Sequence, residues 1–231
     1  IGDRFNLWEW LDHMLSRSAN AAASTVWREA TLMRLLGDRY PTTKRNKALW
    51  RRWSKDVLSK AAYRAIDQPL IDTGMAPEDF KLRRFFTKIG SRYVTRKTSR
   101  TSPLAMVQWM LRVEQGRMVD EFSSLELKRL LYVTIKRVRY AFSPELRGAA
   151  VYSKSGSLYS CRPERGFRCG KYMGNAINIL NSLVLVEAPR QGREPVVYIV
   201  GVMSNELRRN ASEDHSNLGG KIHQLMMELN R

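Results

Sequence analysis

The first 140 residues carry apolar side chains at the spacing of amphipathic helices. In the segment 5–18 the apolar side chains recur three and four positions apart, at Phe5, Trp8, Leu11 and Leu15. Such a repeat places them on one face of a helix. The same periodicity marks the segments 24–38, 47–66, 101–117 and 123–142. The pattern therefore predicts five helices in this part of the chain.

Residues with strong preferences at helix ends set some of the expected bounds. The third helix should end before Pro69, because proline disfavours the helical conformation of the residue that precedes it. A short helix is expected to start at Pro77. The fourth helix has a clear start signal, with Ser102 as the N-cap and Pro103 at the first helical position.

After Gly148 the pattern becomes that of strands. Three β-rich runs follow, 148–160, 178–188 and 195–204. The last two are joined by a Gly-containing segment that suits a hairpin, so an antiparallel sheet is expected. The final segment, 215–229, returns to helical spacing and should pack on the sheet through Ile222, Leu225, Met226 and Leu229. This predicts a mostly helical part, 1–147, and a part with the strands and the C-terminal helix, 148–231.

Composition narrows the class of protein. With 231 residues, 43% hydrophobic and 27% charged, the chain has ordinary globular composition, which argues against disorder. No apolar run is long enough to span a membrane. The formal net charge of +18 implies an anionic partner or environment. Nucleic acid is the usual partner at such a charge, yet no zinc-finger, RNP-like or helix-turn-helix signature is present.

The positive charge is concentrated in one stretch. Between Asp79 and Glu114 there is no acidic residue, while nine basic residues accumulate: Lys81, Arg83, Arg84, Lys88, Arg92, Arg96, Lys97, Arg100 and Arg112. Phe85, Phe86 and Tyr93 are interleaved with them. This stretch could bind a polyanion, or it could be a solvated basic face with no specific ligand.

Two short motifs point to a more specific chemistry. Lys154-Ser155-Gly156 stands in the first strand run, where a glycine often marks a close approach of something to the backbone; a hairpin end with an exposed lysine is the alternative. Upstream, Ser18-Ala19-Asn20 lies between two expected helices, where it could also be a capping pair.

Together the motifs resemble those of the serine β-lactamases and penicillin-binding proteins, whose signatures are S-x-x-K, S-D-N and K-T-G. "SRSANAAAS" is similar to the S-D-N-x-A-A string of the class A enzymes, and "TSPLAMVQWMLRVEQGR" to their T-P-x-x-M-A helix. The resemblance covers nearly the whole chain in the right order. It implies an α/β fold of the β-lactamase/transpeptidase type, with an antiparallel sheet covered by helices on both faces.

The resemblance also implies residue roles and partners. Ser18 would relay a proton to the leaving nitrogen, and Asn20 would hold a side-chain amide of the substrate. Lys154 would present a positive charge, Ser155 would bind the substrate carboxylate, and Gly156 would leave room along the strand edge. The substrate would be a β-lactam or a peptidoglycan peptide ending in D-Ala-D-Ala, with no cofactor, and the setting a bacterial periplasm or cell envelope. Nucleic acid is disfavoured as a partner.

The sequence departs from the family pattern in two places. No S-x-x-K occurs in these 231 residues. The nucleophile, the first helix and two strands are therefore expected in an N-terminal segment upstream of Ile1, without which residues 1–231 should be poorly soluble and inactive. No Glu-x-x-Leu-Asn string precedes Thr101, and Glu78 and Asp79 come too early, so rapid deacylation is not expected.

The remaining candidates are weaker. His13, His215 and His223 have no neighbours at metal-ligand spacing, so no metal site is expected. Cys161 and Cys169 could close the tip of a hairpin in an exported protein, or stay free thiols. The alternative function is a catalytically inactive relative that binds an anionic polymer, such as cell wall or nucleic acid, through its basic surface.

Overall fold

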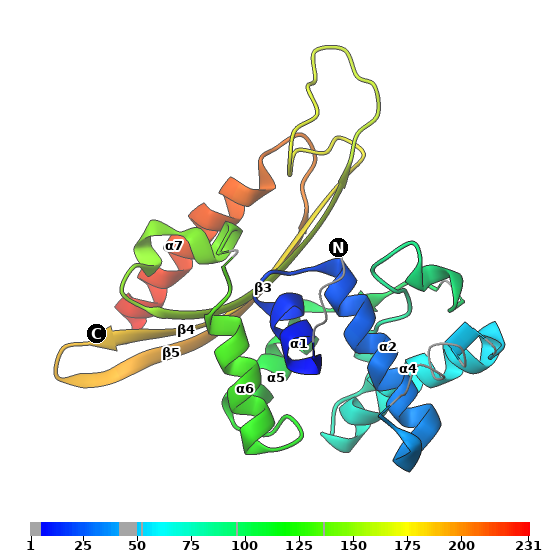
Figure 1. Cartoon of the computed structure of the whole chain (residues 1–231). Helices are drawn as coiled ribbons and strands as arrows, with labels where there is room; N and C mark the ends of the chain where they lie inside the picture. Colours follow the sequence, from blue (N-terminus) through cyan, green and yellow to red (C-terminus); the bar gives the residue numbers. More distant parts are fainter. Residues whose placement is uncertain (1–5, 42–49, 52, 96, 136) are drawn as a thin grey trace. The chain divides into compact units, whose positions relative to one another are not determined.

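The computed structural model describes residues 6–41, 50–51, 53–95, 97–135 and 137–231 (Figure 1). The chain divides into two compact units, Ile1–Ser102 and Pro103–Arg231. The change from helices to strands that the sequence pattern places at 147/148 falls inside the second unit.

The first unit is built from helices with one small pair of strands. Its main elements are α1 (Leu7–Leu15), α2 (Asn20–Leu36), α4 (Lys55–Asp72), β1 (Phe80–Lys81) and β2 (Arg100–Thr101). The two short strands pair antiparallel. Single turns of 3-10 helix occur at Gly37–Arg39, Pro77–Asp79 and Gly90–Arg92.

The helix bounds of this unit correct several expectations. The first helix begins at Leu7, with Asn6 as a capping-box N-cap, and Phe5 lies outside the described residues. The third begins at Lys55, after the N-cap Ser54. Residues 47–49 and 52 of the expected helix 47–66 also lie outside the described residues. The helix start expected at Pro77 gives only a 3-10 turn.

Pro69 does not end its helix. It lies inside the last turn of α4, where it removes only one backbone donor. The backbone N–H and the hydroxyl of Thr73 both donate to the Pro69 carbonyl, at 3.1 and 2.9 Å, and so close that turn. The expectation that the helix would end before Pro69 is therefore wrong.

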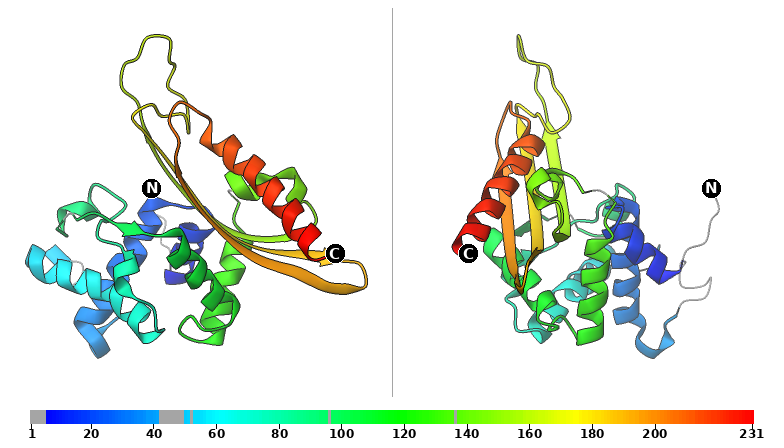
Figure 2. Two further views of the ribbon diagram at one scale, coloured as in Figure 1. Left: turned by 180° about the vertical axis from the view of Figure 1, so that it is seen from behind. Right: turned by 90° about the vertical axis from the view of Figure 1, so that its left-hand side faces the viewer.

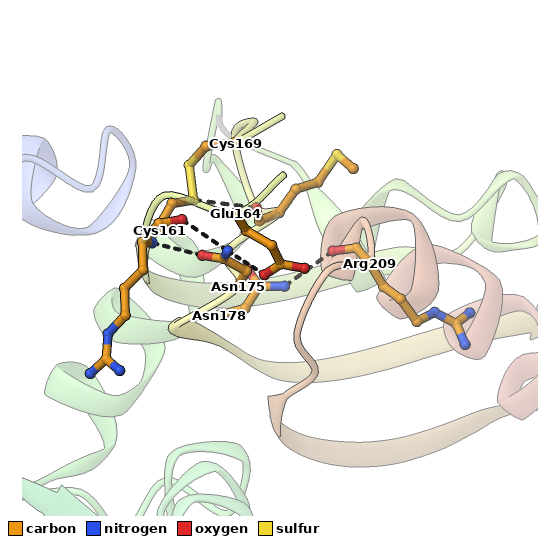
Figure 3. The surroundings of a disulfide bond; sticks show 8 residues. Cys161, Glu164, Cys169, Asn175, Asn178 and Arg209 are labelled. Atoms are coloured by element: carbon orange, nitrogen blue, oxygen red, sulfur yellow. Dashed lines mark hydrogen bonds between the residues drawn. A yellow bond between two sulfur atoms is a disulfide. The ribbon is translucent and has the colours of Figure 1, made fainter. Parts of the chain in front are cut away.

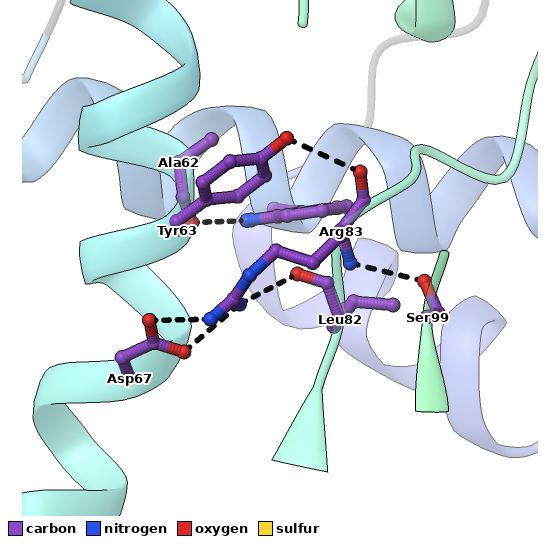
Figure 4. A network of polar contacts seen from close by, with 7 residues as sticks. Ala62, Tyr63, Asp67, Leu82, Arg83 and Ser99 are labelled. Atoms are coloured by element: carbon purple, nitrogen blue, oxygen red, sulfur yellow. Dashed lines mark hydrogen bonds and ion pairs between the residues drawn. The ribbon is translucent and has the colours of Figure 1, made fainter. Parts of the chain in front are cut away.

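The core of the first unit includes part of the basic stretch. The Trp27 ring stacks on Phe85 with 4.2 Å between centroids, and its indole N–H donates to the Ala62 carbonyl at 2.8 Å. Arg83 binds both carboxylate oxygens of Asp67, at 2.9 and 2.7 Å (Figure 4). Its guanidinium also lies 4.7 Å from the centre of the Tyr63 ring. Arg83 and Phe85 thus have structural roles, and Arg96 lies outside the described residues.

The second unit is a three-stranded sheet with helices. Its main elements are α5 (Pro103–Glu114), α6 (Glu121–Tyr132), β3 (Ala150–Ser160), β4 (Ile177–Arg190), β5 (Arg193–Asn205) and α7 (Ala211–Leu229). The strand order is β3-β4-β5 and both pairings are antiparallel. Arg190 pairs with Arg193 across a turn in which Gly192 takes a φ of +68°, which a glycine adopts without strain. The expected hairpin is confirmed.

Helices cover both faces of this sheet (Figures 1 and 2). One face packs on α7 and on the 3-10 turns Arg139–Phe142 and Pro144–Leu146, through Val151, Val184, Val186 and Tyr198 among others. The other contacts α5 and α6. There Lys128 of α6 bridges the carboxylates of Glu114 and Glu187. The expected fold class, an antiparallel sheet with helices on both faces, is confirmed.

Two helices of this unit differ from their expected form. The helix expected over 123–142 ends at Tyr132, and Lys136 lies outside the described residues. In α7, Ile222 and Met226 pack on the sheet, but Leu225 and Leu229 are 52% and 71% exposed. The contact face is centred on Gly219, where an added Cβ would lie 2.9 Å from the Tyr140 carbonyl oxygen. This glycine therefore allows α7 to approach the 3-10 turn Arg139–Phe142 closely.

No helix among the residues that the structure describes is both long and apolar enough to cross a membrane.

Candidate functional site

Lys154, Ser155 and Gly156 lie together in the middle of β3, which is an edge strand of the sheet. They pair with Leu183, Ser182 and Asn181 of β4. Because β3 continues to Ser160, the alternative of a hairpin end is wrong. Lys154 is half-buried, and its Nζ donates to the Ser155 carbonyl at 3.0 Å. The strand thus presents a cation and a hydroxyl on opposite faces, as the period of two requires.

Gly156 is exposed and has open space beside it. No heavy atom of the described residues lies within 4 Å of the position where a Cβ would be. Its φ lies outside the left-handed region that favours glycine. Neither packing nor backbone conformation within the chain therefore requires a glycine here. A ligand that approaches the strand edge is one remaining reason for it.

The structure adds a residue that the sequence reasoning missed, Arg139. Its side chain is 6% exposed, and its Nη2 donates to the Ser157 hydroxyl, next to Gly156, at 2.8 Å. The guanidinium lies 4.9 Å from the centre of the Tyr172 ring. Among the described residues no carboxylate forms an ion pair with it, and its Nε has no hydrogen-bond partner. A buried cation is costly unless it meets an anion, so Arg139 is a candidate contact for a ligand carboxylate.

The electrostatics around Arg139 agree with this reading. Burial alone would raise the pKa of the Tyr172 hydroxyl, but the hydrogen bonds and the charges of Arg139 and, to a smaller extent, of Lys171 lower it overall. Arg139 itself has a φ of +68°, which is uncommon for a residue with a side chain and occurs often at functional sites. The sequence held no signal for it, because Arg139 stands inside a segment with helical periodicity.

Ser18 and Asn20 lie in the first unit, where α1 gives way to α2. Ser18 takes a φ of +54°, and Asn20, which is exposed, is the first residue of α2. The N-cap of α2 is Ala19, and no side chain at that position makes a capping hydrogen bond. Neither Ser18 nor Asn20 is therefore the N-cap of α2. The left-handed conformation of Ser18 stands where the chain leaves α1, and the Ala19 N–H donates to the His13 carbonyl at 3.0 Å.

Cys161 and Cys169 form a disulfide, with 6.1 Å between their Cα atoms (Figure 3). It joins residues of the connection between β3 and β4, directly after the strand that carries Lys154. The disulfide therefore restrains the segment that extends from this strand.

The histidines have structural roles in the second unit. The His215 ring lies between the hydroxyls of Ser182 and Ser204, with Nδ1 and Nε2 at 3.1 and 2.9 Å from them. His223 Nδ1 lies 2.8 Å from the Tyr198 hydroxyl. Within the described part of the chain no group of three or more His, Cys, Asp or Glu side chains could hold a metal ion.

Comparison with known proteins gives matches in fold only. No protein-family model matches the chain, and no curated protein matches it. It is similar to a solved β-lactamase from Chitinophaga pinensis DSM 2588, with a TM-score of 0.62 and 16% identity over 100% of this chain and 67% of that one.

Two further structures give the same picture. TLA-3 extended-spectrum β-lactamase has a TM-score of 0.60 and 13% identity over 96% of this chain and 64% of that one. PBP-A, solved as an acyl-enzyme complex with penicillin G, has a TM-score of 0.58 and 14% identity over 98% and 63%. The chain thus has the fold of these β-lactamases and of PBP-A. It spans about two thirds of their length.

Proposed function

We propose that the chain carries the substrate-binding residues of a serine acyl-transfer enzyme that acts on β-lactams or on peptides ending in D-Ala-D-Ala. The observation that supports this most is the place of Lys154-Ser155-Gly156. The motif lies in the middle of an edge strand, with open space at its glycine. The fold shared with β-lactamases is the second support.

The chemistry assigns each residue a role. An acyl transfer needs a proton relay to the leaving group and positive charge close to the substrate anion. In this proposal Ser18 relays the proton to the leaving nitrogen and Asn20 binds the amide of the substrate side chain. Lys154 stabilises the anionic substrate, and Ser155 donates to its carboxylate.

Arg139 adds to the same function. Its buried guanidinium can form two parallel hydrogen bonds with a carboxylate, a geometry that lysine lacks. It is held beside Ser157 rather than by an acidic partner. We assign it a role in binding the substrate carboxylate, together with Ser155.

The nucleophile is proposed to come from the sequence N-terminal to Ile1, because no Ser-x-x-Lys occurs in residues 1–231. The disulfide supports export, to a bacterial periplasm or cell envelope, since disulfides persist in oxidising compartments. Without a Glu-x-x-Leu-Asn string, hydrolysis of the acyl-enzyme is proposed to be slow.

A fluorescent penicillin tests the proposal. The intact gene product should be labelled covalently at a serine of a Ser-x-x-Lys motif, and residues 1–231 expressed alone should remain unlabelled. Absence of labelling of a folded, intact product would reject the enzyme. Salt-sensitive binding of a polyanion by that unlabelled product would instead support an inactive relative that binds an anionic polymer.

A further inference from the structure

The connection between β3 and β4, residues 161–176, forms a protrusion that we call the finger. It extends beyond the strands at the end of the sheet opposite the β4–β5 turn (Figures 1 and 2). Of its side chains, Tyr172 reaches the candidate site, with its ring centre 4.9 Å from the Arg139 guanidinium. Its base is tied to the segment between β5 and α7, because the Arg208 N–H donates to the Gly174 carbonyl at 2.8 Å.

A disulfide and the hydrogen bonds of a buried asparagine hold the finger together. Besides the disulfide, Asn175, which is 9% exposed, accepts from the Arg162 N–H at 2.8 Å and donates to the Arg162 carbonyl at 3.0 Å. Its amide also donates to the Glu164 carboxylate at 2.7 Å (Figure 3). The finger is therefore held in one shape before any partner binds, which lowers the entropy cost of docking.

The finger carries uncompensated positive charge. Four basic side chains on it are exposed: Arg162, Arg165, Arg168 and Lys171. In the part of the chain that the structure describes, none of them is in an ion pair, and Lys171 lies 5.1 Å from the centre of the Tyr172 ring. The one acidic residue of the finger, Glu164, is neutralised by Arg208, which binds both of its carboxylate oxygens at 2.9 and 3.0 Å. Phe167 stands half-exposed between Arg165 and Arg168.

We propose that the finger docks on the surface of a bilayer that contains anionic phospholipids. Phosphate headgroups attract a cluster of basic side chains, and a half-exposed aromatic ring among them gains by entering the interface. A soluble polyanion without bases, such as polyphosphate, would use the charges alone and would gain nothing from Phe167, whereas only a nucleic acid could stack its bases on that ring. A protruding, rigid tip also meets a plane more readily than it encloses a strand.

The test is vesicle binding by the intact gene product and its variants. The double variant Arg165→Ser/Arg168→Ser should bind vesicles of phosphatidylglycerol and phosphatidylcholine about 30-fold more weakly, since each basic side chain at such a surface contributes about fivefold. The matched control, Arg147→Ser/Arg193→Ser, removes two exposed arginines outside the finger. It should change binding less than threefold. An equal loss in both variants would show that only the net charge matters and would overturn the proposal.

Substitutions of Phe167 distinguish docking on a membrane from binding to a soluble phosphate polymer. Phe167→Ser should weaken binding to the vesicles about tenfold and leave binding to polyphosphate unchanged, while Phe167→Leu should keep vesicle binding. Circular dichroism and mass mapping of the disulfide establish that each variant is folded. Unchanged vesicle binding by Phe167→Ser, with polyphosphate binding lost in the arginine variant, would assign the finger to a phosphate polymer and reject the membrane.

Discussion

Lys154 is the residue whose replacement tests the proposed chemistry most directly. Lys154→Ala should slow acylation by penicillin about 100-fold or more, because removing an electrostatic group from such a site costs a few kcal/mol of barrier. Lys221→Ala, at an exposed position on α7, is the matched control and should acylate normally. The measurement is the acylation rate of the intact gene product. Equal rates in both variants would remove Lys154 from the mechanism.

His215 should make the stability of the protein depend on pH. Burial first, and then the charge of Arg139, lower the pKa of its imidazole, against a smaller opposite effect of Asp214. Below about pH 6.5 His215 binds a proton in the unfolded chain, while in the folded chain its imidazole stays neutral down to its lowered pKa. The stabilisation is therefore complete above that pH and is lost as the pH falls through the lowered folded pKa.

Urea unfolding between pH 5 and 8 measures this effect. The midpoint should fall toward pH 5, and His215→Gln should have a lower midpoint at pH 7.5 but a flatter pH profile. His223, whose pKa is also lowered by burial, contributes in the same direction, so His223→Gln is the comparison. A profile as steep in His215→Gln as in the parent protein would contradict the assignment.

At the scale of elements, two strand glycines differ in their surroundings. Helix α5 packs closely against Gly201, whereas Gly156 has open space beside it. A Cβ at Gly201 of β5 would lie 2.9 Å from the Pro103 carbonyl oxygen and 3.0 Å from a Val107 methyl, both in α5. Gly201→Ala should therefore destabilise the second unit by about 1–3 kcal/mol through overpacking. Gly156→Ala, in open space on β3, should change stability by less than about 0.5 kcal/mol.

The two substitutions are measured by the same denaturant titration and by the acylation rate. Gly156→Ala should leave unfolding unchanged and slow acylation, because its methyl group would occupy the strand edge proposed for the substrate. A large loss of stability in Gly156→Ala would mean that the glycine serves packing. Normal acylation by that variant would mean that the substrate does not use this edge.

The whole molecule is expected to be a slow enzyme. Since no deacylating glutamate motif is present, the acyl adduct with penicillin should persist for minutes or longer. Intact-mass spectrometry of the gene product after a short exposure to penicillin detects it. Rapid return to the unmodified mass with consumption of excess penicillin would show that another base activates water.

The amino-acid sequence by itself determined the elements with local signals and the order of the motifs. Ser102 and Pro103 mark the start of α5, the glycine-containing turn marks the β4–β5 hairpin, and the β-rich composition of three runs marks the strands. These features follow from the local conformational preferences of residues that are neighbours in the sequence, so the order of residues along the chain is enough to predict them. Helical periodicity was less reliable, since the segment 123–142 has it throughout and yet the helix ends at Tyr132.

Only the tertiary structure decided which side chains face which partners. Arg139 became a candidate because the fold buries it beside Ser157 without a carboxylate, and Phe85 joined the core because Trp27 stacks on it. The buried side of α7 includes Gly219, close to the Tyr140 carbonyl, and leaves Leu225 and Leu229 exposed. Burial and close approach arise between residues far apart in the chain, and local patterns carry no information on them.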